Sequence, residues 1–304
     1  RATGGFIGSF ALVDFKNGKI EKITLPEGGT YDVRAGFTKK IASPKALSAL
    51  TPFWEFQDSN WWPDFKLSAE NIKWFYEKSG GPTVDGVIAV NSSFFGDLLK
   101  VTGPIYLPEH KKLLNADNFE LELQNSIEIE AEDKVKPKKI LGELAPLALE
   151  RLMSIDPANF FTLAEVLNQG LKNKEIQLYF SRAEDQQFAT DYGWTGLMAK
   201  EHQDYFHLNV TNIGGGKTDE VISQKINYRL EIQKDATTIV KVLIERSHNG
   251  SGRNYFTGVK NNSYLRFYVP LGSKFISAVG FEPLPDSVFK NYDKDAEFLL
   301  NTEA

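Results

Sequence analysis

Apolar and polar positions change their spacing once along this chain, near residue 200. Between Ser68 and about Lys174, apolar residues recur at the three- and four-residue spacing of helices that bury one face. From Tyr205 to Gly280 they alternate with polar residues and are interrupted by Gly and Asn, which is typical of strands joined by turns. The change predicts two domains, 1–200 and 201–304, the second ending in a C-terminal tail.

The first 200 residues predict both strands and helices. Asn17-Gly18 suits a tight turn, so a β-hairpin is expected between apolar segments 6–13 and 19–24. Ser68 is expected to cap a helix that ends at Gly80-Gly81. Further strands are expected at 84–90, 105–107 and 176–180, and further helices at 92–101, 115–129, 137–153 and 160–171. This order predicts an α/β domain, a layered sheet with helices.

The remaining residues predict strands alone. Ile222, Ile226, Tyr228, Leu230 and Ile232 fall mostly on one side of a strand at a period of two. The expected strands are 206–210, 221–232, 238–246, 264–269 and 275–279. Several short strands with Gly and Asn turns predict a small all-β immunoglobulin-like sandwich domain.

Composition narrows the function classes. The chain has 35 basic and 40 acidic residues and a net charge of -5, which is the wrong sign for attraction to nucleic acid. The sequence has no cysteine, which excludes disulfides, zinc–thiolate sites and a cysteine nucleophile. It also contains no apolar run of the roughly 18 residues that a membrane span needs.

Two motifs are set aside on physical grounds. Gly214 to Thr218 resembles the end of a phosphate-binding loop, but Thr211 stands where that loop needs its first glycine and a strand is expected to follow. A glycine-rich turn is the favoured interpretation. His202 and His207 are five residues apart, which places them on no common helix or strand face, so a histidine metal site is not expected.

The segment 56–65 is the first candidate site. Asp58, Asn60 and Asp64 offer oxygen ligands among aromatic side chains, and such a loop suits a sugar or a divalent cation such as magnesium. Asp58 and Asp64 would be the metal ligands. The alternative is structural: Asp58 makes a local turn, Asp64 caps a helix, and the Trp rings pack.

Lysines around the start of the helix expected from Pro137 form the second candidate site. Lys134, Lys136, Lys138 and Lys139 oppose the helix dipole there, and a bound anion would relieve that conflict. The favoured alternative is that the acidic residues just upstream neutralise them on a solvated face. Those acidic residues are Glu128, Glu130, Glu132 and Asp133.

Several ordered motifs resemble the bacterial domain-of-unknown-function family 4012 (DUF4012). They begin with Arg1-Ala2-Thr3-Gly4-Gly5-Phe6-Ile7-Gly8-Ser9, Asp58-Ser59-Asn60, Pro63-Asp64-Phe65, Val84-Asp85-Gly86-Val87-Ile88-Ala89 and Thr102-Gly103-Pro104. They continue with Gly193-Trp194-Thr195-Gly196, Asn212-Ile213-Gly214-Gly215 with Lys217, and Arg266-Phe267-Tyr268-Val269-Pro270-Leu271-Gly272-Ser273. The resemblance therefore extends over nearly the whole chain.

This resemblance implies a location. Members of the family typically carry a membrane-spanning helix before this region, so Arg1 is expected to begin a fragment of an extracytoplasmic, membrane-anchored protein. The missing cysteines fit that expectation.

A more distant resemblance links the first domain to the LytR-CpsA-Psr phosphotransferases, which transfer glycans from polyprenyl pyrophosphate lipids to cell-wall polymers. In those enzymes arginines hold the pyrophosphate and an aspartate holds magnesium. Arg1 stands where their first arginine would, and Asp32 with Arg34 resembles a second motif. Their later arginine-rich motif is absent, and Lys138 and Lys139 stand in its place.

Two functions follow from these observations. The first is an extracytoplasmic cell-envelope protein that binds cell-wall glycan or an envelope protein without catalysis, with the sandwich as a spacer or adhesive module. The second is a divergent metal-assisted glycan phosphotransferase that uses Arg1, Arg34 and Asp64, with Lys138 and Lys139 as further anion ligands. Whether the chain is an enzyme depends on whether these residues line one cleft.

Overall fold

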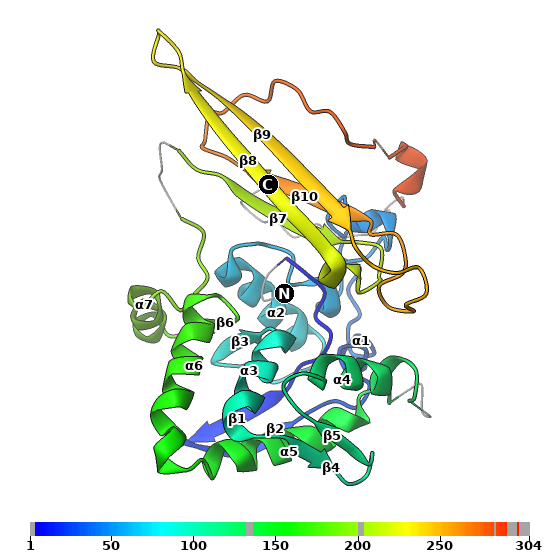
Figure 1. Cartoon of the computed structure of the whole chain (residues 1–304), viewed down its shortest axis with the longest axis vertical. Helices are drawn as coiled ribbons and strands as arrows, with labels where there is room; N and C mark the ends of the chain where they lie inside the picture. Colours follow the sequence, from blue (N-terminus) through cyan, green and yellow to red (C-terminus); the bar gives the residue numbers. More distant parts are fainter. Residues whose placement is uncertain (1–3, 132–135, 200–203, 283, 291–296, 298–304) are drawn as a thin grey trace. The chain divides into compact units, whose positions relative to one another are not determined.

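The computed structural model describes residues 4–131, 136–199, 204–282, 284–290 and 297 (Figure 1). Contacts divide the chain into two compact units, one of residues 1–203 with 276–304 and the other of residues 204–275. The C-terminal tail, expected with the second domain, thus groups with the first unit from Ile276 onward. Within the described residues, no helix combines the length and apolar character that crossing a membrane requires.

The predicted N-terminal hairpin is confirmed. Strands β1 (Leu12–Lys16) and β2 (Lys19–Thr24) pair antiparallel, and Lys16 lies opposite Lys19 across the turn. Asn17 and Gly18 have φ angles of 51° and 74°, the left-handed conformation that this dipeptide adopts readily. The first strand begins at Leu12 rather than at Phe6.

Helix α2 (Phe65–Lys78) begins one turn earlier than predicted. Asp64, not Ser68, is its N-cap residue, and the Asp64 side chain accepts hydrogen bonds from the backbone N–H groups of Lys66 and Leu67. Ser68 lies inside the helix, where its hydroxyl donates to the Trp62 carbonyl and accepts from the Trp62 N–H. The helix ends before Gly80, which has a φ angle of 90°.

Helix α2 packs against a two-stranded sheet that joins distant parts of the chain. Strands β3 (Gly86–Val90) and β6 (Ile176–Phe180) pair antiparallel, with Ile88 opposite Leu178. Phe65, Ala69 and Tyr179 form the buried cluster between helix and sheet, with Val87 and Ala89 beside it. Helix α7 (Ala183–Asp191), which the sequence pattern did not predict, follows β6.

A second apolar core lies among the elements that follow β3. It is enclosed by helices α3 (Ser92–Thr102), α4 (Phe119–Glu128) and α5 (Lys139–Met153) and strands β4 (Ile105–Leu107) and β5 (Lys112–Leu114). Its buried members are Leu99, Ile105, Leu107, Leu114, Phe119, Ile140 and Leu144. Helix α6 (Phe160–Lys172) approaches α3 closely at Gly170, where an added Cβ would lie 2.6 Å from the Phe94 ring.

Two pairs of strands make up the second unit. Strand β7 (His207–Asn212) pairs antiparallel with β10 (Ser263–Tyr268), and β8 (Ile222–Ile232) pairs antiparallel with β9 (Thr238–His248). The β8–β9 hairpin turns at Ala236, which has a φ angle of 64°. Residues 275–279, predicted as a fifth strand, are not in a strand.

The described residues therefore mix helices with small antiparallel sheets. This mixture is consistent with the predicted α/β class. Every sheet among the described residues has two strands, and an immunoglobulin-like sandwich is not confirmed. The short helix α1 (Tyr31–Arg34) and 3-10 turns complete this part of the chain. The turns are Leu47–Ala49, Phe56–Asp58, Pro157–Asn159, Thr218–Val221 and Asp286–Val288.

Candidate functional site

The structure joins Arg34 to the segment that holds Asp58. Arg34 ends helix α1, and its Nε lies 2.8 Å from Oε1 of Glu55, a residue just before the 3-10 turn that contains Asp58. The Arg34 side chain is 61% exposed, whereas that of Glu55 is 15% exposed, so the ion pair lies at the edge of the core. Asp32 accepts a hydrogen bond from the Gly28 N–H at 2.9 Å and holds its own loop.

Asp58 carries the most perturbed carboxyl group of this segment. Burial and, to a smaller extent, the negative charge of Glu55 together raise the pKa of Asp58 from 3.8 to about 6. Glu55 is itself held by Arg34 and by Gln57, whose Nε2 donates to Glu55 Oε2 at 2.7 Å. A carboxyl group that titrates near neutral pH is suited to transferring a proton.

The aromatic residues around Asp58 belong to the core. Trp54 and Trp61 are 2% and 5% exposed, and the Trp54 Nε1 donates to the Asp58 carbonyl at 2.9 Å. Phe56 is buried, with its ring edge-to-face against Phe10 and tilted against Tyr76. Trp54 and Trp61 therefore present no face on which a sugar could stack, whereas the neighbouring Trp62 is half-buried.

Asn60 is buried within the same segment. Its Oδ1 has no hydrogen-bond partner among the described residues, and the same holds for Gln57 Oε1 and Trp62 Nε1. Buried polar atoms usually have a partner, so this concentration within six residues marks an unusual place in the core.

Asp64 has a structural role that accounts for both of its oxygens. Oδ1 accepts from the N–H groups of Lys66 at 3.0 Å and Leu67 at 3.5 Å, which caps helix α2. Oδ2 accepts from the Met198 N–H at 2.9 Å, and so ties the helix to a segment 134 residues further along the chain. No group of three or more His, Cys, Asp or Glu residues able to hold a metal ion occurs in the part of the chain that the structure describes.

The lysines near helix α5 contact the segment that leads into α1. Lys136 Nζ lies 2.7 Å from Oε2 of Glu27, and the Lys138 N–H donates to the Glu27 carbonyl at 3.0 Å. Lys138 also covers Gly29, where an added Cβ would lie 2.5 Å from its Nζ. Residues 27–34 are thus the common neighbour of the Asp58 segment and of these lysines.

Among the described residues, Lys136 and Lys139 form ion pairs with acidic residues outside the run upstream. Lys139 Nζ lies 4.0 Å from Glu109, and Lys136 pairs with Glu27, while Glu130 of the acidic run pairs with Lys112. Arg1, Lys134, Glu132 and Asp133 lie outside the described residues.

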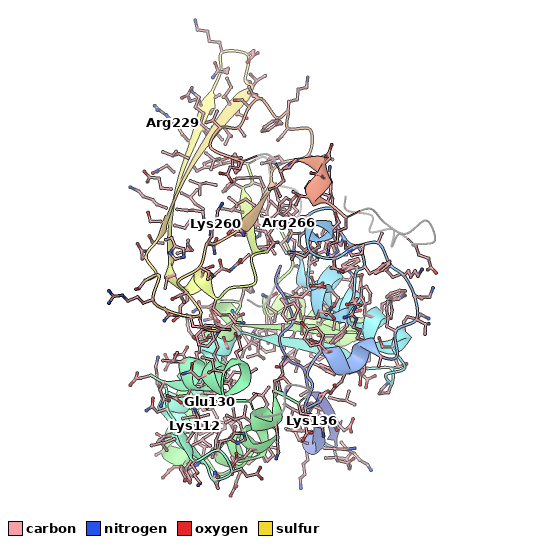
Figure 2. All side chains as sticks on the ribbon, turned by 90° about the vertical axis from the view of Figure 1, so that its right-hand side faces the viewer. Lys112, Glu130, Lys136, Arg229, Lys260 and Arg266 are labelled. Atoms are coloured by element: carbon pink, nitrogen blue, oxygen red, sulfur yellow. The ribbon has the colours of Figure 1, made fainter. Side chains whose placement is uncertain are left out.

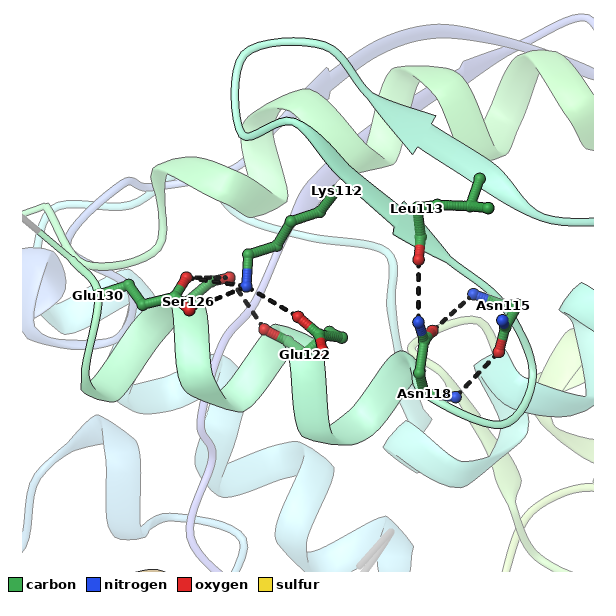
Figure 3. Close-up of polar contacts among 7 residues, drawn as sticks. All are labelled: Lys112, Leu113, Asn115, Asn118, Glu122, Ser126 and Glu130. Atoms are coloured by element: carbon green, nitrogen blue, oxygen red, sulfur yellow. Dashed lines mark hydrogen bonds and ion pairs between the residues drawn. The ribbon is translucent and has the colours of Figure 1, made fainter.

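Sequence reasoning missed three polar clusters. Lys112 Nζ contacts Glu122 and Glu130 beside Ser126, and spacings of four residues on the predicted helix could have placed these three side chains on one face (Figure 3). His110 Nδ1 lies 2.5 Å from Glu143. On α2, Lys73 bonds to the hydroxyl of Ser181 and lies over the ring of Tyr179. No sequence signal could have joined Lys73 to Ser181 and Tyr179, because they lie far apart along the chain.

Comparison with known proteins gives one match. Residues 1–127 match the family described as "Protein of unknown function (DUF4012)". The match includes Arg34, Asp58, Asn60 and Asp64 and ends before the lysines and the later motifs. Neither the curated proteins nor the solved structures contain a match to this chain.

Proposed function

We propose that this chain is part of a non-catalytic, extracytoplasmic cell-envelope protein whose first unit binds cell-wall glycan or an envelope protein. The observation that carries the proposal is the engagement of Asp64. A phosphotransferase would need this carboxylate to hold magnesium. The two carboxylate oxygens of Asp64 instead accept three hydrogen bonds from backbone N–H groups, and Asp64 is only 9% exposed. Arg34, one of the residues with a proposed role on pyrophosphate, is paired with Glu55.

The binding surface that these contacts favour is the exposed side of residues 27–34. Lys136 adjoins this segment through its ion pair with Glu27. We call the surface formed by Tyr31, Arg34 and Lys136 the α1 surface. The Tyr31 side chain is 56% exposed, and the side chains of Arg34 and Lys136 are 61% and 55% exposed. An exposed aromatic ring beside planar and cationic donors suits the apolar face and the hydroxyl groups of a sugar.

The location rests on the family match over residues 1–127, because members of that family typically carry a membrane-spanning helix before this region. Protease added to intact cells should then remove the protein. Protection in intact cells with cleavage after lysis would contradict an extracytoplasmic location.

The alternative function is a metal-assisted glycan phosphotransferase, as the distant resemblance to the LytR-CpsA-Psr enzymes implies. The observation in its favour is Asp58, whose carboxyl group titrates near pH 6 beside Glu55. In this role Asp58 would accept the proton of the attacking hydroxyl group.

A transfer assay separates the two functions. The protein is incubated with magnesium, a glycan attached to polyprenyl pyrophosphate, and cell-wall polymer as acceptor. The label is carried by the glycan. The binding function predicts that label never becomes covalently attached to the polymer. Magnesium-dependent attachment that Asp58→Asn abolishes, in a variant that still folds, would establish the phosphotransferase.

A further inference from the structure

A shallow cavity of about 470 Å³, widely open to solvent, lies wholly within residues 204–275, at one end of the β8–β9 hairpin. Arg246, His248 and Lys260 belong to its lining, whereas the lining contains no acidic side chain among the described residues. Figure 2 shows Lys260 beside these strands. The volume falls within the range of small-molecule sites.

A well-defined loop, residues 249–260, forms one wall of the cavity. The Asn254 side chain accepts hydrogen bonds from the N–H groups of Phe256 at 2.9 Å and Thr257 at 3.0 Å. Phe256 and Thr257 are buried and anchor the loop. Gly250 and Gly258 leave no room for a side chain, because an added Cβ would lie 2.5 Å from the Thr257 carbonyl oxygen and 2.4 Å from the Asn254 carbonyl oxygen, respectively.

His248 fastens this loop through both ring nitrogens. Its Nδ1 accepts from the Gly250 N–H at 3.2 Å, and its Nε2 lies 3.0 Å from the Val259 carbonyl oxygen, to which an Nε2–H donates. His248 therefore shapes the cavity, and Arg246 and Lys260 supply the positive charge of the cavity lining.

The two cations reach the cavity from different segments. Arg246 is half-buried on β9, and its Nη2 lies 3.4 Å from Asn261 Oδ1 and 3.3 Å from Ser263 Oγ. Lys260 is exposed at the end of the loop. Asp219 accepts a hydrogen bond from Asn261 Nδ2 at 3.1 Å and is not part of the lining.

We propose that this cavity is a binding site for a phosphate group. The lining brings a guanidinium and an ammonium group from different segments to one open cavity. A tetrahedral oxyanion offers acceptor oxygens on several sides and can contact both groups, whereas a carboxylate offers two oxygens in one plane. The half-burial of Arg246 strengthens its attraction to the anion because less solvent screens it. The site belongs to the second unit and does not depend on the function proposed for the first.

Nuclear magnetic resonance of the full chain tests the site, with inorganic phosphate as the probe at low ionic strength. The backbone amide signals of Gly250 and Gly258 should shift saturably, and acetate at equal concentration should shift them less. Lys260→Gln and Arg246→Gln should each weaken binding about tenfold or more, because each removes a charge-assisted hydrogen bond. Arg229→Gln, a change on β8 of a side chain that is 78% exposed, should bind as the wild type does.

Two further probes distinguish the source of the phosphate. Tighter binding of glycerol phosphate than of a poly(glycerol phosphate) chain identifies a free monoester as the ligand, and the reverse order identifies a phosphodiester polymer. Because Lys260 is exposed, Lys260→Gln decides the question even if Arg246→Gln does not fold. Absent shifts at Gly250 and Gly258, or equal shifts in wild type and Lys260→Gln, would overturn the proposal.

Discussion

Lys112 Nζ lies 2.8 Å from a carboxylate oxygen of Glu122 and 2.8 Å from one of Glu130, so a single ammonium group on β5 joins two acidic side chains of α4 and the turn after it. Only 18% of the Lys112 side chain is exposed. Burial is the largest single influence on the pKa of Lys112 and lowers it. The two carboxylates together outweigh burial, so the pKa of Lys112 lies above its ordinary value.

Lys112→Met should destabilise the fold by about 1–2 kcal/mol, because it removes the cation and leaves two partly buried carboxylates on one face. Urea unfolding of wild type and variant measures the difference. Lys100→Met is the matched control, since Lys100 pairs with Asp97 on an exposed surface and its loss should change stability much less than Lys112→Met does. Equal costs for the two variants would show that the Lys112 contacts have no special weight.

Asp58 should make stability depend on pH in the direction opposite to that of a salt-bridged carboxylate. Its pKa is raised from 3.8 to about 6, so the folded state holds a proton that the unfolded state releases, and stability falls as pH rises through that interval. Asp58→Asn should be more stable than wild type at pH 7.5, by roughly 2–3 kcal/mol. The two proteins should be similar below pH 3.8.

Thermal unfolding of both proteins from pH 3.5 to 8 measures this difference. A stability difference that is the same at every pH would contradict the raised pKa. So would an Asp58→Asn variant that is less stable at pH 7.5, because the carboxylate would then be stabilised by a contact.

Asp64→Ala should destabilise the fold by about 2 kcal/mol, and Asp64→Asn by about 1 kcal/mol, because the first loses the cap of α2 and the contact to Met198 and the second keeps one acceptor oxygen. Asp156→Ala is the control. Asp156 caps only a short 3-10 turn through one exposed hydrogen bond of 2.8 Å. A surface metal ligand would behave differently: both Asp64 variants would unfold as the wild type does, and magnesium would raise only the wild type's melting temperature.

Local sequence signals predicted the helices and strands of this fold better than they predicted the contacts between those elements. Asn17-Gly18 specified its hairpin because the positive φ angles of that turn are set within two residues. Helix α2 was predicted with two candidate caps, Ser68 from the helical pattern and Asp64 from the structural interpretation of residues 56–65, and the structure has the second. The contact of Asp64 with Met198, far along the chain, had no local signal. The pairing of β3 with β6 is likewise a long-range contact with no local signature.

The candidate site shows the same division. The sequence identified Arg34 and Asp58 as notable residues but not the Glu55 that stands between them, because a glutamate in a loop is ordinary until the fold buries it. Burial of Trp54 and Trp61 was also undecidable from sequence, since aromatic residues suit both a core and a sugar site. The cavity in the second unit is lined by Gly250 and Gly258, which lie against backbone carbonyl groups of the same loop. These contacts exist only once the loop has folded, so the sequence pattern did not indicate them.

The most direct test of the central claim is binding of the full chain to purified cell-wall glycan by the wild type and by Tyr31→Ala, with Tyr106→Ala as a control on another exposed tyrosine. The measured quantity is the fraction of protein that sediments with the insoluble glycan. If the α1 surface binds glycan, Tyr31→Ala should weaken binding about tenfold, the loss of one stacked ring, while Tyr106→Ala binds as the wild type does. No binding by the wild type, or equal binding by all three proteins, would contradict a glycan-binding α1 surface.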